Sequence, residues 1–297
     1  ANFSAWAMQE FNGSLFVGIC PAPMNGTGGI ICRLDIPGGI PTFEINLDQE
    51  GISCMATNST GTMLYVVGVD SRTDSNARVY KRTLDGMWSE TSELINWWHA
   101  YGITWIGSRM FVSGQGPGSV AWSDDDGETW TYSAWVGVNR AYSIQSLGTD
   151  LILTAADGPS AGYPYKILRS TDGGTNWTTL LTSNTPDWYL NKQVLWNNLV
   201  VCGIGYTKIA SVDTSGTLTI YDLPFTLRQT YNNLNVMTGE YLVAAASDGV
   251  WRTLDLVTWQ KVWTTSPGAS TFKCFTMWNG KPILSTGYDT AEIRGVI

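Results

Sequence analysis

The residues best suited to chemistry in this sequence are aromatic and polar side chains near the starts of predicted strands. They are Trp98, His99, Tyr101, Arg140, Tyr142, Asp187 and Trp188. Ring faces beside guanidinium, imidazole and carboxyl groups are typical of a sugar-binding pocket, where rings stack and polar groups fix orientation. We therefore predict these residues as ligand-binding. The competing interpretation is that aromatic rings at strand starts pack between sheets as core.

Motifs that would indicate catalysis, a cofactor or a metal are missing from the sequence. It contains no Gly-x-Ser-x-Gly, Walker or dinucleotide-binding pattern. His99 is the only histidine, and without a Cys-x-x-Cys pair it cannot build a metal site. The Gly-rich stretch Gly114–Gly118 has no helix pattern after it, which argues against a phosphate site. We expect no catalytic residue, no cofactor and no metal.

Two segments share the pattern Ser-x-Asp-x-Gly-x-(Thr/Asn)-Trp. The residues that match it are Ser123, Asp125, Gly127, Thr129 and Trp130 in the first segment, and Ser170, Asp172, Gly174 and Trp177 in the second. Ser and Asp side chains bond nearby backbone and close a tight turn, Gly supplies a positive φ, and Trp anchors the turn on the core. Degraded copies occupy residues 83–88 and 253–259.

This pattern resembles the Asp-box, or BNR repeat, of sialidase-like β-propellers. The resemblance implies that the nine matching residues are structural and lie at turns between the outer strands of a blade, away from the catalytic face. The resemblance further implies that this chain is a diverged member of the Asp-box propellers. Sialidases bind a carboxylate with three converging arginines, and the chain lacks their Arg-Ile-Pro motif.

A larger repeat, a turn followed by an apolar strand, organises the whole chain. The turns lie at positions 13, 61, 107, 148, 198, 239 and 280, with steps of 48, 46, 41, 50, 41 and 41 residues. This spacing is typical of a four-stranded propeller blade. We predict an all-β, seven-bladed β-propeller that occupies residues 1–297 as a single domain, with six or eight blades as alternatives. The seventh unit lacks an outer strand, and we expect residues 2–4 to supply it, so that N- and C-terminal strands close the ring.

Composition narrows the range of partners and compartments. The net charge of −8 and the isoelectric point of about 4.6 argue against nucleic acid and against an anionic membrane surface as partners. No run reaches the roughly 18 apolar residues of a membrane-spanning helix. The number of cysteines, five, leaves at least one unpaired within the chain. Cys20 and Cys32 could face each other across a hairpin, whereas Cys54, Cys202 and Cys274 are equally compatible with buried free thiols.

Three functions are compatible with these observations. The first is a non-catalytic recognition or surface module that binds a glycan or protein partner, such as a virion (phage) decoration or receptor-binding protein. It implies an extracellular or virion-surface location. The second is a glycoside hydrolase or polysaccharide lyase of sialidase-like type, although no Asp/Glu pair can be placed across a cleft. The third is a structural protein that assembles with other subunits of a larger particle.

Overall fold

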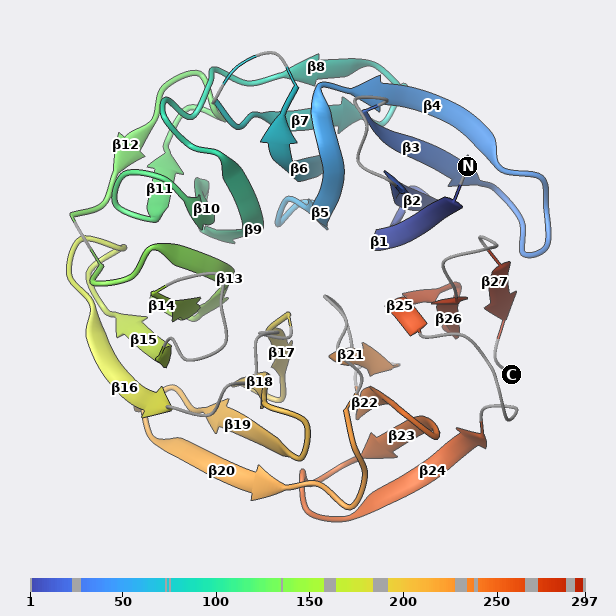
Figure 1. The fold of residues 1–297 in the computed structure, drawn as a ribbon, viewed down its shortest axis with the longest axis vertical. Coiled ribbons are helices and arrows are strands. Elements are labelled where there is room, and N and C mark those ends of the chain that lie inside the picture. Colours follow the sequence, from blue (N-terminus) through green and yellow to red (C-terminus); the bar gives the residue numbers. More distant parts are fainter. Residues whose placement is uncertain are drawn as a thin grey trace.

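The computed structural model of the chain describes residues 2–22, 28–72, 74, 76–134, 136–157, 164–183, 192–227, 234–237, 240–264, 272–286 and 292–295. Strands, turns and bends make up this described part, and it contains no helix. It therefore contains no helix able to cross a membrane. Figure 1 shows the strands arranged radially, in groups, around a common centre.

Hydrogen bonds join the described strands into six sheets, and neighbouring strands are antiparallel. The first sheet contains β1 (Asn2–Phe11), β2 (Ser14–Ala22), β3 (Gly29–Leu34) and β4 (Thr42–Leu47). The second, of eight strands, contains β5 (Gln49–Thr57), β6 (Met63–Ser71), β7 (Val79–Thr83), β8 (Trp88–Glu90), β9 (His99–Ile106), β10 (Arg109–Gln115), β11 (Val120–Ser123) and β12 (Thr131–Tyr132).

Four smaller sheets complete the described structure. The third contains β13 (Arg140–Leu147), β14 (Asp150–Ala156), β15 (Tyr165–Ser170) and β16 (Thr178–Ser183). The fourth contains β17 (Val194–Trp196), β18 (Leu199–Ile204), β19 (Lys208–Val212) and β20 (Leu218–Asp222). The fifth contains β21 (Leu234–Met237), β22 (Tyr241–Ala246), β23 (Gly249–Thr253) and β24 (Trp259–Thr264). The sixth contains β25 (Phe272–Trp278), β26 (Lys281–Thr286) and β27 (Glu292–Gly295).

Tight turns between the first two strands of a group explain the periodicity of the sequence. Asn12 and Gly13 have φ values of 52° and 78° and connect β1 to β2. Two consecutive residues with positive φ match the right-handed twist of the flanking strands, and Asn and Gly adopt this conformation most readily. Asn279 and Gly280 repeat the arrangement between β25 and β26. Each such turn therefore starts an apolar second strand.

The prediction of seven blades in a ring closed by terminal strands is wrong. Only four sheets have the four strands of a regular blade, which also excludes the alternatives of six or eight such blades among the described residues. β5–β8 and β9–β12 form one sheet because Val69 pairs with His99. β1 pairs with β2 over its whole length, and the described sheet of β25–β27 has three strands. Residues 2–4 are thus part of an inner strand.

Side-chain packing joins the first sheet to the last instead. Ala5, Met8 and Leu15 form one buried cluster with Cys274 and Trp278. The Trp278 indole Nε1 donates to the Gly13 carbonyl at 3.1 Å, and the Asn279 backbone N–H donates to Glu10 Oε2 at 3.0 Å. The first and last sheets are therefore held together by hydrophobic contacts and a few hydrogen bonds, and not by an N-terminal strand that pairs with the last sheet.

The rest of the core also lies between neighbouring groups of strands. One cluster combines Tyr65 of β6 with Trp97 and Met110, and another combines Phe111 of β10 with Ile144 and Leu168. Burial of these apolar faces supplies the main favourable free energy of folding. None of the five cysteines, all of which lie in the described part of the chain, forms a disulfide, so the Cys20–Cys32 bridge does not form. Cys32 lies opposite Val17 in the ladder, out of register with Cys20.

The two Ser-x-Asp turns contain nearly the same hydrogen bonds. Ser123 Oγ donates to Asp125 Oδ1 at 2.7 Å, and Thr129 donates to both Asp125 carboxylate oxygens, through N–H at 2.9 Å and Oγ1 at 2.6 Å. The Gly127 N–H donates to Ser123 Oγ at 2.7 Å. The Trp130 indole donates to the Ser92 carbonyl at 2.8 Å, which attaches the turn to the loop before β9.

In the second turn, Asn176 performs the role of Thr129. Its N–H donates to Asp172 Oδ1 at 2.9 Å, and its side-chain Nδ2 donates to Asp172 Oδ2 at 2.7 Å. Ser170 Oγ donates to Asp172 Oδ1 at 2.8 Å and accepts the Gly174 N–H at 2.9 Å, while Trp177 Nε1 donates to the Gly174 carbonyl. The substitution of Asn for Thr therefore keeps every bond to the carboxylate.

Asp172 should make the stability of this turn depend on pH. The hydrogen bonds from Asn176, backbone first, and from Ser170 lower the pKa of Asp172 from 3.8 to about 2. A carboxyl group whose pKa is lower in the folded state stabilises the folded protein at pH values above its pKa in the unfolded chain. This contribution to the free energy of unfolding disappears as the pH falls from about 4 to about 2. We expect Asp172→Ala to lower stability at pH 5–7 and the difference from wild type to shrink toward pH 2, measured by denaturant unfolding.

Asp222→Ala is the matched control, because the Asp222 carboxylate is exposed and contacts only the exposed Lys208 among the described side chains. Its effect should be small at neutral pH. A difference for Asp172→Ala that stays constant from pH 7 to pH 2 would show that the ionised carboxylate does not hold the turn.

Candidate functional site

Four of the predicted ligand-binding residues come together at the start of the inner strands. They are His99 and Tyr101 of β9 and Arg140 and Tyr142 of β13. We call these four residues, together with Asp70 of β6, the mouth cluster. Trp98 lies next to it in sequence, but its side chain is 57% exposed and does not belong to the ring stack. Asp187 and Trp188 lie outside the described residues.

A repeated β-bulge orients the two tyrosines. In β9 the pairing with β10 skips between Gly102 and Ala100, so Tyr101 is the extra residue. In β13 it skips between Ala141 and Ser143, so Tyr142 is the extra residue. A bulge places two residues opposite one and turns a side chain out of the normal alternation. Inner strands β1, β5 and β25 shift register at corresponding positions.

The rings of the mouth cluster form a continuous stack. The His99 and Tyr101 ring centroids are 5.2 Å apart with an interplanar angle of 30°, and those of Tyr101 and Tyr142 are 5.1 Å apart at 31°. Arg140 Nη1 donates to the Tyr101 hydroxyl at 3.2 Å. His99 and Tyr101 are buried, whereas Tyr142 and Arg140 are half-buried. The solvent-facing end of the stack is therefore the Tyr142 ring, and the Arg140 guanidinium lies against the Tyr101 hydroxyl.

Asp70 is a member of the site that the sequence patterns did not indicate. Its Oδ1 lies 3.3 Å from His99 Nδ1, without the alignment of a hydrogen bond. Burial raises the pKa of the Asp70 carboxyl and Glu50 raises it further, whereas Arg140 opposes the shift. Burial, with a contribution from Arg140, lowers the pKa of His99 to about 4, so the imidazole is neutral at pH 7.

Trp97 explains the Gly-rich stretch that follows β10. Its side chain is fully buried, and its Nε1 donates to the Pro117 carbonyl at 3.3 Å. A Cβ atom on Gly116 would overlap the indole ring, and one on Gly114 would overlap the His99 carbonyl. These glycines let the backbone pass close to Trp97 and hold the start of β9 in place. Their role is packing beside the mouth cluster.

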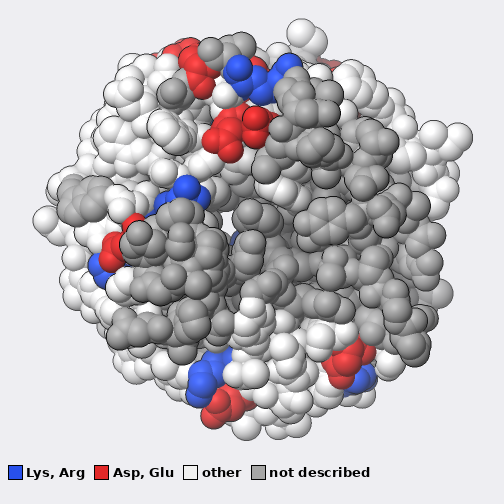
Figure 2. All heavy atoms as spheres, viewed as in Figure 1, with Lys and Arg blue, Asp and Glu red and all other residues white. Residues whose placement is uncertain are grey.

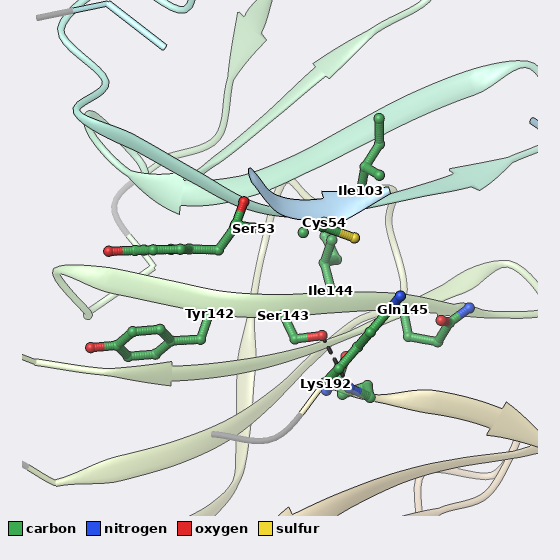
Figure 3. A pocket seen from close by; sticks show the side chains of 11 residues that line it. Ser53, Cys54, Ile103, Tyr142, Ser143, Ile144, Gln145 and Lys192 are labelled. Atoms are coloured by element: carbon green, nitrogen blue, oxygen red, sulfur yellow. Dashed lines mark hydrogen bonds between the residues drawn. The ribbon is translucent and has the colours of Figure 1, made fainter. Parts of the chain in front are cut away.

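Two cavities lie along the inner strands, and the smaller one borders the mouth cluster. The smaller has a volume of about 30 Å³, and its lining includes Tyr101, Tyr142, Ser53 and Lys192. In Figure 3 the Tyr142 side chain points away from this cavity, while Lys192 extends toward Gln145. The larger cavity, about 300 Å³, is lined by residues of β1, β17, β21 and β25 and by Lys192.

The charged side chains on the described part of this face are divided among small groups. Figure 2 shows small groups of acidic and basic residues, several with both charges side by side, around an opening near the centre. Among the described residues, no group of three or more His, Cys, Asp or Glu side chains could hold a metal ion. The mouth cluster can therefore stack on a flat ligand and donate hydrogen bonds through Arg140, while the neutral imidazole of His99 contacts a carboxyl.

Comparisons with known proteins support the propeller architecture. The chain is similar to a catalytically inactive variant of virginiamycin B lyase from Staphylococcus aureus, solved with quinupristin (15% identity, 97% of this chain, 93% of that chain, TM-score 0.74). It is also similar to YCF48 from Cyanidioschyzon merolae (11% identity, 97% of this chain, 97% of that chain, TM-score 0.63). A third similar structure is the extracellular domain of BT4673 from B. thetaiotaomicron (11% identity, 96% of this chain, 40% of that chain, TM-score 0.66).

These neighbours are β-propeller proteins, so the chain has an all-β, propeller-like fold. At 11–15% identity the similarity describes the fold alone. No protein-family model matches the sequence, and the comparison with curated proteins gives no match. The function is therefore argued below from the site.

Proposed function

We propose that this propeller protein is a non-catalytic recognition module whose mouth cluster binds a glycan on the outside of a cell or virion. The observation that carries the proposal is the stack of His99, Tyr101 and Tyr142, which ends in the half-buried Tyr142 ring and whose Tyr101 hydroxyl accepts a hydrogen bond from Arg140. A tyrosine ring offers an apolar face for a sugar ring, and the guanidinium offers several donors for hydroxyl groups. A protein partner is the alternative ligand.

The Ser-x-Asp turns support kinship with Asp-box propellers. Their carboxylates accept hydrogen bonds from the turn itself, which supports a structural role for the nine motif residues. Ser123 ends β11, at the level of Met110, whereas His99 pairs with Gln115 at the other end of the same sheet. The turns and the mouth cluster therefore lie at opposite ends of the strands, as this kinship implies.

Tyr142→Ala should weaken glycan binding about tenfold, since a stacked ring contributes on the order of 1 kcal/mol beyond its buried area. Tyr142→Phe should keep most of the affinity because it keeps the ring. Phe43→Ala is the control, because that ring is 61% exposed on outer strand β4, far along the sheet from the inner strands. The measurement is a glycan array, followed by calorimetric titration of the best ligand.

Absence of binding to every glycan, with binding to a cell-surface protein that Tyr142→Ala abolishes, would replace the glycan with a protein ligand. Binding that survives Tyr142→Ala would move the site away from the mouth cluster. The assembly alternative is tested by measuring the molecular size of the isolated chain in solution. A stable monomer would argue against the idea that the protein is an obligate component of a larger particle.

The contact of His99 with Asp70 favours a second candidate, a glycoside hydrolase or polysaccharide lyase. A neutral imidazole beside a carboxyl group of raised pKa is a pair that could accept and donate protons. Turnover of a polysaccharide that His99→Gln abolishes while folding is preserved would support this candidate. We expect no turnover, because the stack buries His99 beneath Tyr101.

A further inference from the structure

A groove lies at the outer rim of the molecule, between the first two groups of strands. It has a volume of about 290 Å³ and is lined by residues in and next to β4 and β8, together with Tyr80 of β7. This volume is below the roughly 300–1,000 Å³ of sites for drug-sized ligands and suits a single long side chain. In Figure 1 β4 and β8 lie on the outside of the ring, whereas β9 and β13, which carry the stacked rings of the mouth cluster, lie near its centre. The groove is therefore separate from the candidate glycan site.

Aromatic and aliphatic side chains form the walls of this groove. Trp88 of β8 and Ile45 of β4 are half-buried, and Leu47 is buried in the same cluster. The Trp88 indole N–H donates to Glu44 Oε2 at 3.2 Å, which fixes the orientation of the ring. The face of an indole ring attracts a cation, and in proteins this cation is more often a guanidinium than an ammonium.

The rim of the groove carries carboxylates that a single guanidinium only partly neutralises. Glu90 and Asp48 line the groove, and each lies 3.5 Å from Arg78, Glu90 from its Nε and Asp48 from its Nη1. The same guanidinium is closer to two further carboxylates, at 2.7 Å and 2.5 Å, those of Asp74 and Glu93. Even with Arg72, which lies close to Asn46 on the groove wall, four carboxylates are balanced by only two guanidinium groups. The groove therefore has an excess of negative charge.

A buried hydroxyl group on the same groove lacks a hydrogen-bond partner. Tyr80 is 6% exposed, and its hydroxyl forms no hydrogen bond with a described residue. Burial, and after it the Glu90 carboxylate, raises the pKa of Tyr80 to about 12, so the hydroxyl is protonated at pH 7 and lies near the rim. The Gln49 amide is close enough to oppose this shift, yet its Oε1 also lacks a partner. Buried polar groups without partners are rare, so this pair indicates a missing ligand or water molecule.

We propose that this groove binds an arginine side chain from a basic segment of a partner protein. The guanidinium stacks on the Trp88 ring and donates to the carboxylates of Glu90 and Asp48. A remaining N–H donates to the Tyr80 oxygen, and the Tyr80 hydroxyl donates to Gln49 Oε1, so that both buried groups gain a partner. The excess of carboxylates selects a cation, and a planar group with five donors matches several acceptors better than a lysine ammonium does. This interface goes beyond the glycan function and does not depend on it.

The test is an NMR titration of the full chain with the peptide acetyl-Gly-Arg-Gly-amide, followed at the indole N–H signal of Trp88. The variant Trp88→Phe assigns this signal, because the signal is missing from its spectrum. The comparison ligand carries citrulline in place of arginine, since citrulline has nearly the same shape without the positive charge. We expect the arginine peptide to shift the Trp88 signal until it saturates and the citrulline peptide to leave the signal unchanged.

Two variants that remove the same charge separate the groove from the general attraction of a cation to a protein of net charge −8. Glu90→Gln should weaken binding of the arginine peptide about fivefold, since it removes a partly exposed carboxylate from the rim and keeps the size of the side chain. Glu128→Gln should leave the affinity unchanged, because Glu128 is exposed and contacts Lys81 outside the groove. Equal shifts with the arginine and citrulline peptides, equal weakening by the two variants, or no shift of the Trp88 signal in the wild type would overturn the proposal.

Discussion

Trp278→Ala should lower the free energy of unfolding by about 3–5 kcal/mol, as expected for removal of a large buried aromatic side chain. Trp278 is 1% exposed and packs with Ala5, Met8 and Leu15 where the last sheet meets the first. The variant also leaves the Gly13 carbonyl without its indole donor. Denaturant unfolding, compared with wild type under the same conditions, measures the loss.

Trp98→Ala is the matched control for this experiment. It removes the same side chain from a site that is 57% exposed, so we expect a change within about 0.5 kcal/mol. A similarly small change for Trp278→Ala would mean that contact between the first and last sheets contributes little to stability. The stability would then come from the remaining clusters between neighbouring sheets.

Glu44→Gln should destabilise the protein by about 3–5 kcal/mol, because it leaves a buried guanidinium without its counter-charge. Glu44 of β4 lies 3.0 Å from Arg82 Nε and 2.8 Å from Arg33 Nη1, and it accepts the Trp88 indole N–H at 3.2 Å. The Glu44 and Arg82 side chains are 9% and 7% exposed. These contacts connect the first sheet with β7 and β8, so their loss should appear as a lower denaturation midpoint.

Two further variants test the explanation. Asp222→Asn removes a carboxylate from an exposed pair with Lys208, and we expect an effect below about 1 kcal/mol. The double variant Glu44→Leu with Arg82→Met should recover much of the stability, since replacing a buried ion pair with apolar side chains of similar volume is often neutral. If the double variant is no more stable than Glu44→Gln, the stability lost in Glu44→Gln comes from altered packing and not from the uncompensated charge.

The sequence patterns predicted the local features of this fold well. The turn at Asn12 and Gly13 and the Ser-x-Asp turns around Asp125 and Asp172 are present where the residue types indicated them. Such turns depend on contacts within about five residues, and Asn, Asp, Ser and Gly have strong conformational preferences at these positions. The prediction that His99, Arg140 and Tyr142 lie at the starts of inner strands was equally local.

Pairing between distant strands was predicted less well. A period of 41–50 residues indicates repeated units, but it does not show that Val69 pairs with His99 and merges two units into one sheet. The period also does not show that β1 pairs with β2 along its whole length. Both outcomes depend on which backbone groups remain free after neighbouring strands have paired, which no local pattern encodes.

The amino-acid sequence by itself determined the all-β class, the tight turns and the residues that end up near the central opening. The tertiary structure decided that Tyr101 and Tyr142 stack, that Asp70 joins His99, and that Gln193 is buried with its amide unpaired. These relations depend on bulges that shift the register by one residue and on the approach of different sheets. A one-residue shift reverses the direction of a side chain, so only the assembled strands reveal it.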